Sequence, residues 1–317
     1  MTSLVGNDAA RGAIAAAAEG GNLHHAWLIA GPEGVGKATH AREVSAWLLA
    51  RAAGDDGGRT DAMIAAGAHP DFRVLDRLPV DADKPEKGTA RSIKIDQVRA
   101  LGPMFAVKPS MSSRRMIVID AIDDLERAAS NALLKNLEEP PTGTIFLLVS
   151  HAPGRLLPTI RSRCRLLRFD PLGDADVASV LRGALPQANA DEIAALVRAG
   201  AGSPGRALRF AGLDLAAIET ALMTIAVDGD PSNQQRVRLS KALAPKAAQP
   251  RYEAFLERVP AFIAERARAM SGDGLRDALD AYASAADLAR MSIAQSLDPG
   301  TTAFEMGGLV ARLARPR

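Results

Sequence analysis

Residues 26–39 read Ala-Trp-Leu-Ile-Ala-Gly-Pro-Glu-Gly-Val-Gly-Lys-Ala-Thr, and this stretch decides the fold. An apolar run of strand length is followed by Gly31, Gly34, Gly36 and Lys37 in the spacing of a P-loop, and then by a helical pattern. Glycines let backbone N–H groups curve around phosphate oxygens, the helix directs its positive end at them, and the lysine adds a mobile charge. The sequence therefore predicts a phosphate site between the first strand and the helix after it.

The position after the lysine departs from the motif. A Ser or Thr hydroxyl there normally holds Mg²⁺, but this chain has Ala38. Thr39 comes one residue later, which turns its side chain by about 100° on a helix, although it remains a candidate nucleotide-binding residue. We expect the loop to hold phosphate better than it holds the metal.

A second strand, over residues 116–120, is apolar throughout and ends in Asp120. A carboxylate at that place, beside a P-loop, usually orders Mg²⁺ through water, so Asp120 is predicted to complete the nucleotide site. In proteins that hydrolyse ATP, a glutamate follows and polarises the attacking water, but here the residue is Ala121. Asp123 and Asp124 would have to reach back to replace it, and we expect little of them as a base.

Further apolar runs over residues 72–75, 144–150 and 166–169 bring the number of predicted strands to five. Helical segments separate them, which predicts an α/β domain with a doubly wound parallel sheet. Residues 54–70 are polar and rich in glycine, so we expect an exposed loop, and Asp96 is expected to cap a helix over 97–105. From residue 171 onward the strand signal ends and only helices are predicted.

Composition narrows the class of protein. The 317 residues are 47% hydrophobic and 24% charged, as in globular proteins, and are too many for one ordinary core. A net charge of +2 gives no support for tight DNA binding by the chain alone, and aromatic residues are scarce. The single cysteine, Cys164, fits a reducing compartment. With neither a signal peptide nor a membrane-spanning run in the sequence, we expect a cytoplasmic protein.

Several longer motifs extend over essentially the whole chain, and with them it resembles the bacterial AAA+ clamp-loader subunits of DNA polymerase III. The most specific are the Leu-Lys-Asn-Leu-Glu-Glu-Pro-Pro block and the Ser-Arg-Cys block. The segments that carry the resemblance are 25–28, 95–99, 131–141, 161–164 and 201–207.

The resemblance implies three domains: an AAA+ nucleotide-binding domain over 1–170, a helical lid over 171–212 and a helical collar over 213–317. It implies a hetero-pentameric ring with delta and tau/gamma subunits, which acts on the sliding clamp and primed DNA as part of the DNA-directed DNA polymerase holoenzyme. Within that ring it implies a stator, a relatively rigid subunit beside the ATP-driven motors. Arg163 would then project as an arginine finger into a neighbour's ATP site.

The chain departs from the motor pattern at a third point besides Ala38 and Ala121. Gly205 occupies the place of the lid arginine that senses phosphate, although the adjacent Arg206 could partly compensate. ATP or ADP binding is therefore expected to be weak or absent. Relatives often carry a four-cysteine zinc module before Asp120, but residues 48–115 contain no cysteine, and we expect no zinc or other metal.

Two alternatives remain open beside the stator. One is a catalytically active AAA+ ATPase, either a gamma/tau-like motor subunit or a helicase loader. The other, a sequence-specific DNA-binding protein, lacks a basic stripe. Ala38 and Ala121 favour the stator, because losing either a metal ligand or a water-positioning group typically costs several kcal/mol of barrier, and here both are gone. Arg163 itself has a structural alternative, which is a simple pairing with a carboxylate.

Overall fold

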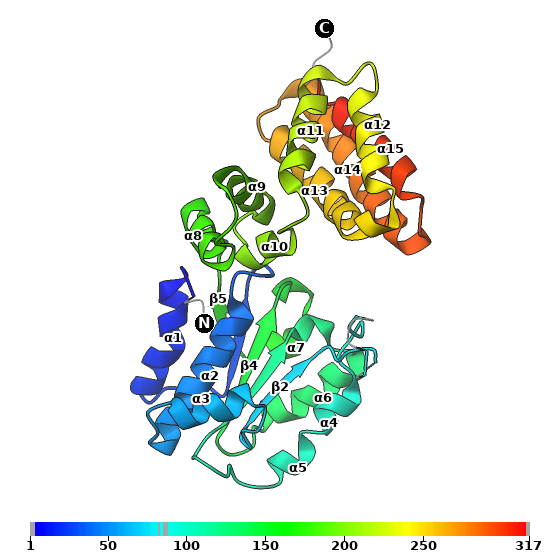
Figure 1. Ribbon diagram of the computed structural model, residues 1–317. Coiled ribbons are helices and arrows are strands. Elements are labelled where there is room, and N and C mark those ends of the chain that lie inside the picture. Colours follow the sequence, from blue (N-terminus) through cyan, green and yellow to red (C-terminus); the bar gives the residue numbers. More distant parts are fainter. Residues whose placement is uncertain (1–3, 82, 85–87, 315–317) are drawn as a thin grey trace. The chain divides into compact units, whose positions relative to one another are not determined.

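The computed structural model describes residues 4–81, 83–84 and 88–314 (Figure 1). By their contacts they divide into two compact units, Met1–Asp176 and Val177–Arg317. The finer division into three domains, with boundaries after residues 170 and 212, stays a prediction.

The first unit is built on one five-stranded sheet in the order β2-β3-β4-β1-β5, and every neighbouring pair is parallel. Its strands are β1 (Ala26–Ala30), β2 (Phe72–Asp76), β3 (Arg115–Asp120), β4 (Thr144–Ser150) and β5 (Arg165–Arg168). Ala30 pairs with Ser150, and Asp120 pairs with Val149, so three strands end together at one edge of the sheet. The predicted α/β fold class is confirmed.

Helices cover both faces of this sheet, as Figure 1 shows. They are α1 (Asp8–Glu19), α2 (Lys37–Ala53), α3 (Gly58–Ala65), α4 (Ile95–Arg99), α5 (Gly102–Phe105), α6 (Arg127–Glu138) and α7 (Pro158–Arg161). Alternate strand residues enter two separate cores: Trp27 and Leu147 lie with Leu48 of α2, whereas Leu28 and Leu148 lie in the core that α6 covers. Burial on both faces explains why the strands are apolar without alternation.

Two local expectations are wrong. Residues 54–70 do not form a simple exposed loop, because Asp55 accepts hydrogen bonds from the backbone N–H and hydroxyl of Thr60 and holds α3 in place. Asp96 is not a helix cap: α4 begins at Ile95, and the side chain of Gln97 accepts from the N–H of Lys94. The predicted helix over 97–105 is two short helices.

The second unit is helical. Its elements are α8 (Asp174–Ala184, which begins in the first unit), α9 (Ala190–Gly200), α10 (Pro204–Arg209), α11 (Leu215–Asp228), α12 (Gln234–Leu243), α13 (Gln249–Ala267), α14 (Gly272–Gln295) and α15 (Pro299–Ala311). Within it, Arg258 of α13 is fully buried and pairs with Glu219 of α11 and with Glu265, two turns further along α13. Among the residues described, no helix is both long and apolar enough to cross a bilayer.

Candidate nucleotide site

The phosphate loop has the glycine conformations that the motif predicts. Gly31, Gly34 and Gly36 all have positive φ, at 155°, 79° and 97°. At Gly31 an added Cβ would lie 2.0 Å from the carbonyl oxygen of Phe169, so no other residue fits there. Gly36 is the N-cap of α2, which begins at Lys37, and the positive end of the helix therefore faces the loop.

Lys37 is bound to its own loop. Its side chain is 2% exposed, and Nζ donates to the carbonyl oxygens of Gly31, at 2.6 Å, and Pro32. Burial lowers the pKa of Lys37 to about 8, against the opposing effect of the Asp120 and Asp123 carboxylates. Two of the three ammonium donors of Lys37 are therefore taken by its own loop, which leaves one donor for a phosphate.

The positions that would serve Mg²⁺ and the attacking water carry no suitable side chain. Ala38 packs against the core of the first unit, and Thr39 lies at the surface. Asp120 ends β3 where the motif predicts, and burial raises its pKa, although Arg42 acts in the opposite direction. The next residue, Ala121, is 2% exposed, so it is buried rather than directed at a ligand. The backbone of the site fits phosphate, but its side chains do not fit a hydrolytic metal centre.

Asp123 and Asp124 have other roles. Asp123 accepts hydrogen bonds from the Ser150 hydroxyl at 3.0 Å and from the N–H groups of His151 and Ala152, which fixes the end of β4. Asp124 forms an ion pair with Arg77 at 3.2 Å. Neither carboxylate is placed as a general base by this geometry.

His151 is the residue of this site that the sequence analysis missed. Burial, followed by the charge of Lys37, lowers its pKa, and it lines a cavity of about 940 Å³ together with Gly31 and Pro32. Arg161 and Ser162 line the same cavity, which brings part of the Arg-Ser-Arg-Cys motif beside the phosphate loop. Its position in the sequence could have identified it, because His151 directly follows a buried strand that lies next to β1, at the carboxyl edge of the sheet.

Arg163 follows α7, and its side chain contacts Glu138 and Thr159 of the same chain. Its Nη2 atom lies 2.7 Å from Oε1 of Glu138, and its Nη1 donates to the Thr159 carbonyl at 2.8 Å. Within the described part of the chain, Arg163 does not line the cavity beside Gly31. The next residue, Cys164, is partly buried, and desolvation raises its pKa to about 12.

The lid motif lies in the second unit. Ser203 caps α10 by accepting from the N–H of Arg206, and the Arg206 side chain forms an ion pair with Glu257 at 2.8 Å. A role for Arg206 in place of the missing lid arginine stays a prediction. Among the described residues, no group of three or more His, Cys, Asp or Glu side chains could hold a metal ion, and the absence of zinc also stays a prediction.

Comparison with known proteins shows similarity to subunits of DNA polymerase III. Residues 6–173 match the family described as DNA polymerase III, delta subunit. DNA polymerase III subunit delta' of Pseudomonas aeruginosa is 38% identical over 59% of this chain and 56% of its own length. The Escherichia coli subunit delta' is 33% identical over 67% of this chain and 62% of its own length. The chain thus spans about six tenths of these relatives.

The comparison also includes gamma subunits and solved structures. DNA polymerase III subunit gamma of Buchnera aphidicola is 32% identical over 51% of this chain and 42% of its own length. A gamma subunit-related protein of Thermotoga maritima is 16% identical, covers 92% of this chain with 96% of its own length, and has a TM-score of 0.43.

Proposed function

Because the chain belongs to the DNA polymerase III delta-subunit family, we propose that it is a clamp-loader subunit of the delta' type and serves as the stator of the ring. Its partners would be delta and tau/gamma subunits in a hetero-pentamer, and through them the sliding clamp and primed DNA. It would be a non-catalytic component of the DNA polymerase holoenzyme and, as a replication subunit, would work in the cytoplasm. Residues 1–170, 171–212 and 213–317 would form its nucleotide-type domain, lid and collar.

One observation carries this proposal: the chain keeps the glycine cradle but has alanines where the metal hydroxyl and the catalytic carboxylate belong. Ala38 and Ala121 flank the site from two different elements, and Lys37 is already bound to loop carbonyls. Each missing group costs several kcal/mol of transition-state stabilisation. ATP or ADP would therefore bind weakly or not at all, without hydrolysis, and no zinc would be required.

The catalytic contribution would instead be made in trans. Arg163 is partly exposed just before β5, within the motif that implies an arginine finger. A guanidinium stays charged and can contact two oxygens of a γ-phosphate as charge shifts in the transition state. In the ring, Arg163 would complete the ATP site of an adjacent motor subunit.

The second candidate function is an active ATPase, either a motor subunit or a helicase loader. The gamma relatives favour it, but they are less similar than the delta' relatives above. Ala38 and Ala121 count against it for the reasons given.

The test is co-purification of the full chain with delta and tau/gamma subunits, followed by ATPase assays of the chain alone and of the ring. We expect a stable complex, no turnover by the isolated chain, and clamp- and DNA-stimulated turnover by the ring. A Lys37-dependent ATPase of the isolated chain would instead establish the second candidate. Failure to enter the complex would refute the stator role.

A further inference from the structure

A second cavity, of about 340 Å³, lies beside the edge strand β2, and none of its lining residues lines the cavity beside the P-loop. The α4–α5 segment forms one wall and the chain leading into β3 forms another. Its apolar lining comes mainly from Leu75, Leu101, Met104 and Val107. This volume is at the lower end of the range of small-molecule pockets.

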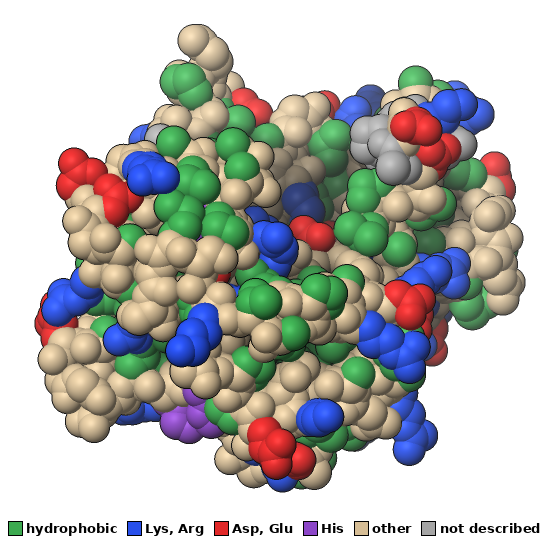
Figure 2. All heavy atoms as spheres, turned by 90° about the horizontal axis from the view of Figure 1, so that it is seen from below, with side chains coloured by type: hydrophobic (Ala, Val, Ile, Leu, Met, Phe, Trp, Pro, Cys, Tyr) green, Lys and Arg blue, Asp and Glu red, His purple; other side chains and the backbone are tan. Residues whose placement is uncertain are grey.

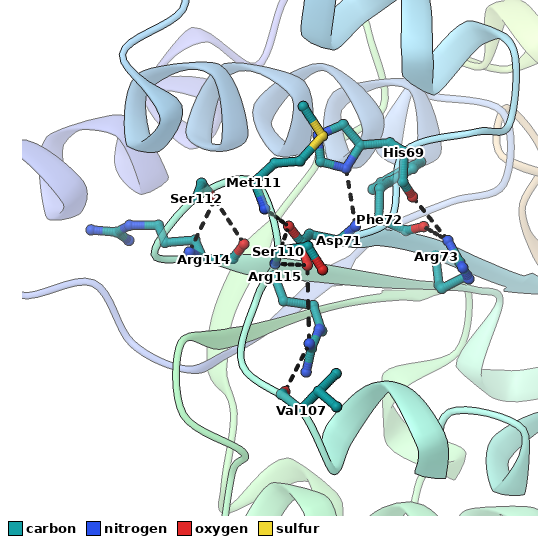
Figure 3. Close-up of polar contacts among 10 residues, drawn as sticks. All are labelled: His69, Asp71, Phe72, Arg73, Val107, Ser110, Met111, Ser112, Arg114 and Arg115. Atoms are coloured by element: carbon teal, nitrogen blue, oxygen red, sulfur yellow. Dashed lines mark hydrogen bonds and ion pairs between the residues drawn. The ribbon is translucent and has the colours of Figure 1, made fainter.

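Arg115 lines this cavity and is only 1% exposed. Figure 3 shows its side chain running past Asp71 to the backbone of Val107, whose carbonyl accepts from Nη2 at 3.1 Å. Among the residues that the structure describes, Nε and Nη1 have no hydrogen-bond partner. A buried guanidinium normally has its donors satisfied, so these two unpartnered nitrogens, which have almost no exposed surface, leave polar contacts unmade beside the cavity.

The nearest counter-charge is already occupied. Asp71 is 1% exposed, and its carboxylate accepts from the N–H groups of Ser110 and Met111 at 2.8–2.9 Å. Its closest approach to the guanidinium of Arg115 is 4.0 Å, at the limit of an ion pair. Asp71 therefore holds the loop before β3 and pairs only loosely with Arg115.

The pocket carries an excess of positive charge. Arg73 lines the same cavity, so two arginines face the one carboxylate of Asp71. His69 lies beside them, and burial lowers its pKa, so it adds no charge near neutral pH. Burial also lowers the pKa of Arg115, as expected for a cation whose environment does not compensate it. An anion in the cavity would balance this charge.

We propose that this pocket binds a carboxylate carried on an apolar group, with Arg115 as its anchor. The planar guanidinium offers two donors in the geometry that a carboxylate matches. The apolar wall of Leu101, Met104 and Val107 suits a hydrocarbon attached to that carboxylate. Inorganic phosphate fits less well, because it would leave charged oxygens against this wall. The carboxylate could come from a free acid or from the C-terminus of a partner peptide.

The test uses the full chain with ¹³C-methyl-labelled methionine, so that the Met104 methyl signal reports on the pocket. Hexanoate is titrated in parallel with two control compounds. Hexan-1-ol has the apolar group but no carboxylate, and inorganic phosphate is an anion without an apolar group. A second pair of probes is acetyl-Ala-Leu with a free carboxylate and its C-terminal amide. We expect saturable shifts with the two carboxylates and none with hexanol, phosphate or the amide. Tighter binding of the peptide would identify a partner terminus as the source, and tighter binding of hexanoate a free acid.

Two variants locate the binding. Ala100→Phe places a large side chain in the cavity and keeps Arg115 in the chain, and Ala106→Phe, outside the lining, is its matched control. Arg115→Met removes the anchor but risks the fold, so its thermal unfolding is measured as well. We expect carboxylate affinity to fall about tenfold or more in Ala100→Phe and Arg115→Met and to persist in Ala106→Phe. The proposal is overturned if neither carboxylate saturates, if phosphate binds as well, or if Ala100→Phe binds normally.

Discussion

The Nη2 atom of Arg163 lies 2.7 Å from Oε1 of Glu138, so the proposed arginine finger is ion-paired with the acidic motif of its own chain. The two side chains are 32% and 50% exposed. An ion pair this open to water contributes about 1 kcal/mol or less and is screened by salt. Arg163 can therefore leave Glu138 for a more strongly charged phosphate at little cost.

The first prediction concerns this arginine. Arg163→Ala should leave the chain folded and able to assemble, since only a partly exposed ion pair and one hydrogen bond to the Thr159 carbonyl are lost, yet lower the ring's clamp- and DNA-stimulated ATPase and slow clamp loading. At the ATP site that receives Arg163, the hydrolysis rate should fall roughly 10³- to 10⁵-fold. The hydrolysis rate of the whole ring should fall by the fraction that this site contributes. Arg163→Lys should rescue little, because an ammonium cannot make the two-pronged contact.

Glu138→Gln is the matched control for Arg163→Ala. It breaks the same ion pair but keeps the guanidinium, so it should retain the ATPase of the complex. If both variants load clamps at the normal rate, Arg163 makes no contribution in trans. If both lose activity equally, Arg163 acts only through its pairing with Glu138.

The second prediction concerns metal dependence. Ala38 offers no oxygen, and Thr39 lies at the surface, so any ATP or ADP affinity measured by calorimetry should be equal in Mg²⁺ and in EDTA. Thr39→Ala should leave this affinity unchanged. Ala38→Ser places a hydroxyl at the first turn of α2 and should introduce a dependence on Mg²⁺. Strong Mg²⁺ dependence of the native chain, lost in Thr39→Ala, would show that Thr39 replaces the missing ligand.

A third prediction follows from His40, which is 4% exposed and packs against Phe169. Burial, followed by the charge of Arg11, lowers its pKa from 6.5 to about 4. Above pH 6.5 the histidine is neutral in both states. As the pH is lowered from 6.5 to 4, the unfolded chain binds a proton at His40 and the folded chain does not. The free energy of unfolding therefore decreases by about 3 kcal/mol in total over this range. Below pH 4 this contribution is constant.

The variant His40→Leu tests this pH dependence. Urea unfolding of the native chain and of the variant is measured at several pH values. The difference in unfolding free energy between the native chain and the variant should change across pH 4–6.5 and be flat above it. Carboxylates also titrate near the acid end, but they do so in both chains and cancel in the difference. A difference independent of pH would show that His40 titrates normally in the folded chain.

The elements predicted best from sequence are those that local pattern determines. The continuous apolar runs gave all five strands, and the spacing from Gly31 to Lys37 gave the loop and the helix after it. What could not be predicted depends on partners far along the chain. The bond from Asp123 to the end of β4 joins residues nearly thirty positions apart. Arg115 reads as a polar flank of a strand but lies buried between distant segments.

For the candidate site, the sequence predicts which residues take part, and only the structure gives their contacts. Sequence identified Lys37 and Asp120, and the structure places both at the carboxyl edge of the sheet. It could not show that Lys37 donates to loop carbonyls, because that depends on how closely the loop folds back. Nor could the sequence show that Arg163 forms an ion pair with Glu138, because a motif identifies residue types but does not determine their rotamers.

One uncovered surface in the second unit bears on assembly. On α14 the apolar side chains of Leu279, Tyr282 and Ile293 are 54%, 42% and 68% exposed. Their spacing puts them within about 60° of one another around the helix. The buried alanines of the same helix lie toward a different side. Elsewhere, on the face shown in Figure 2, side chains of both charges are interspersed with apolar ones.

The last prediction is that this apolar stripe is part of the collar contact. Ile293→Asp should leave thermal unfolding of the isolated chain nearly unchanged, because the side chain is already in water, but should weaken co-purification with delta and tau/gamma subunits. An interface that buries a carboxylate against apolar side chains loses several kcal/mol of association energy. Val80→Asp is the matched control, since Val80 is 66% exposed and belongs to the first unit. If both variants assemble normally, the stripe lies outside the ring contact; if both fail, the effect comes from added charge and not from the collar.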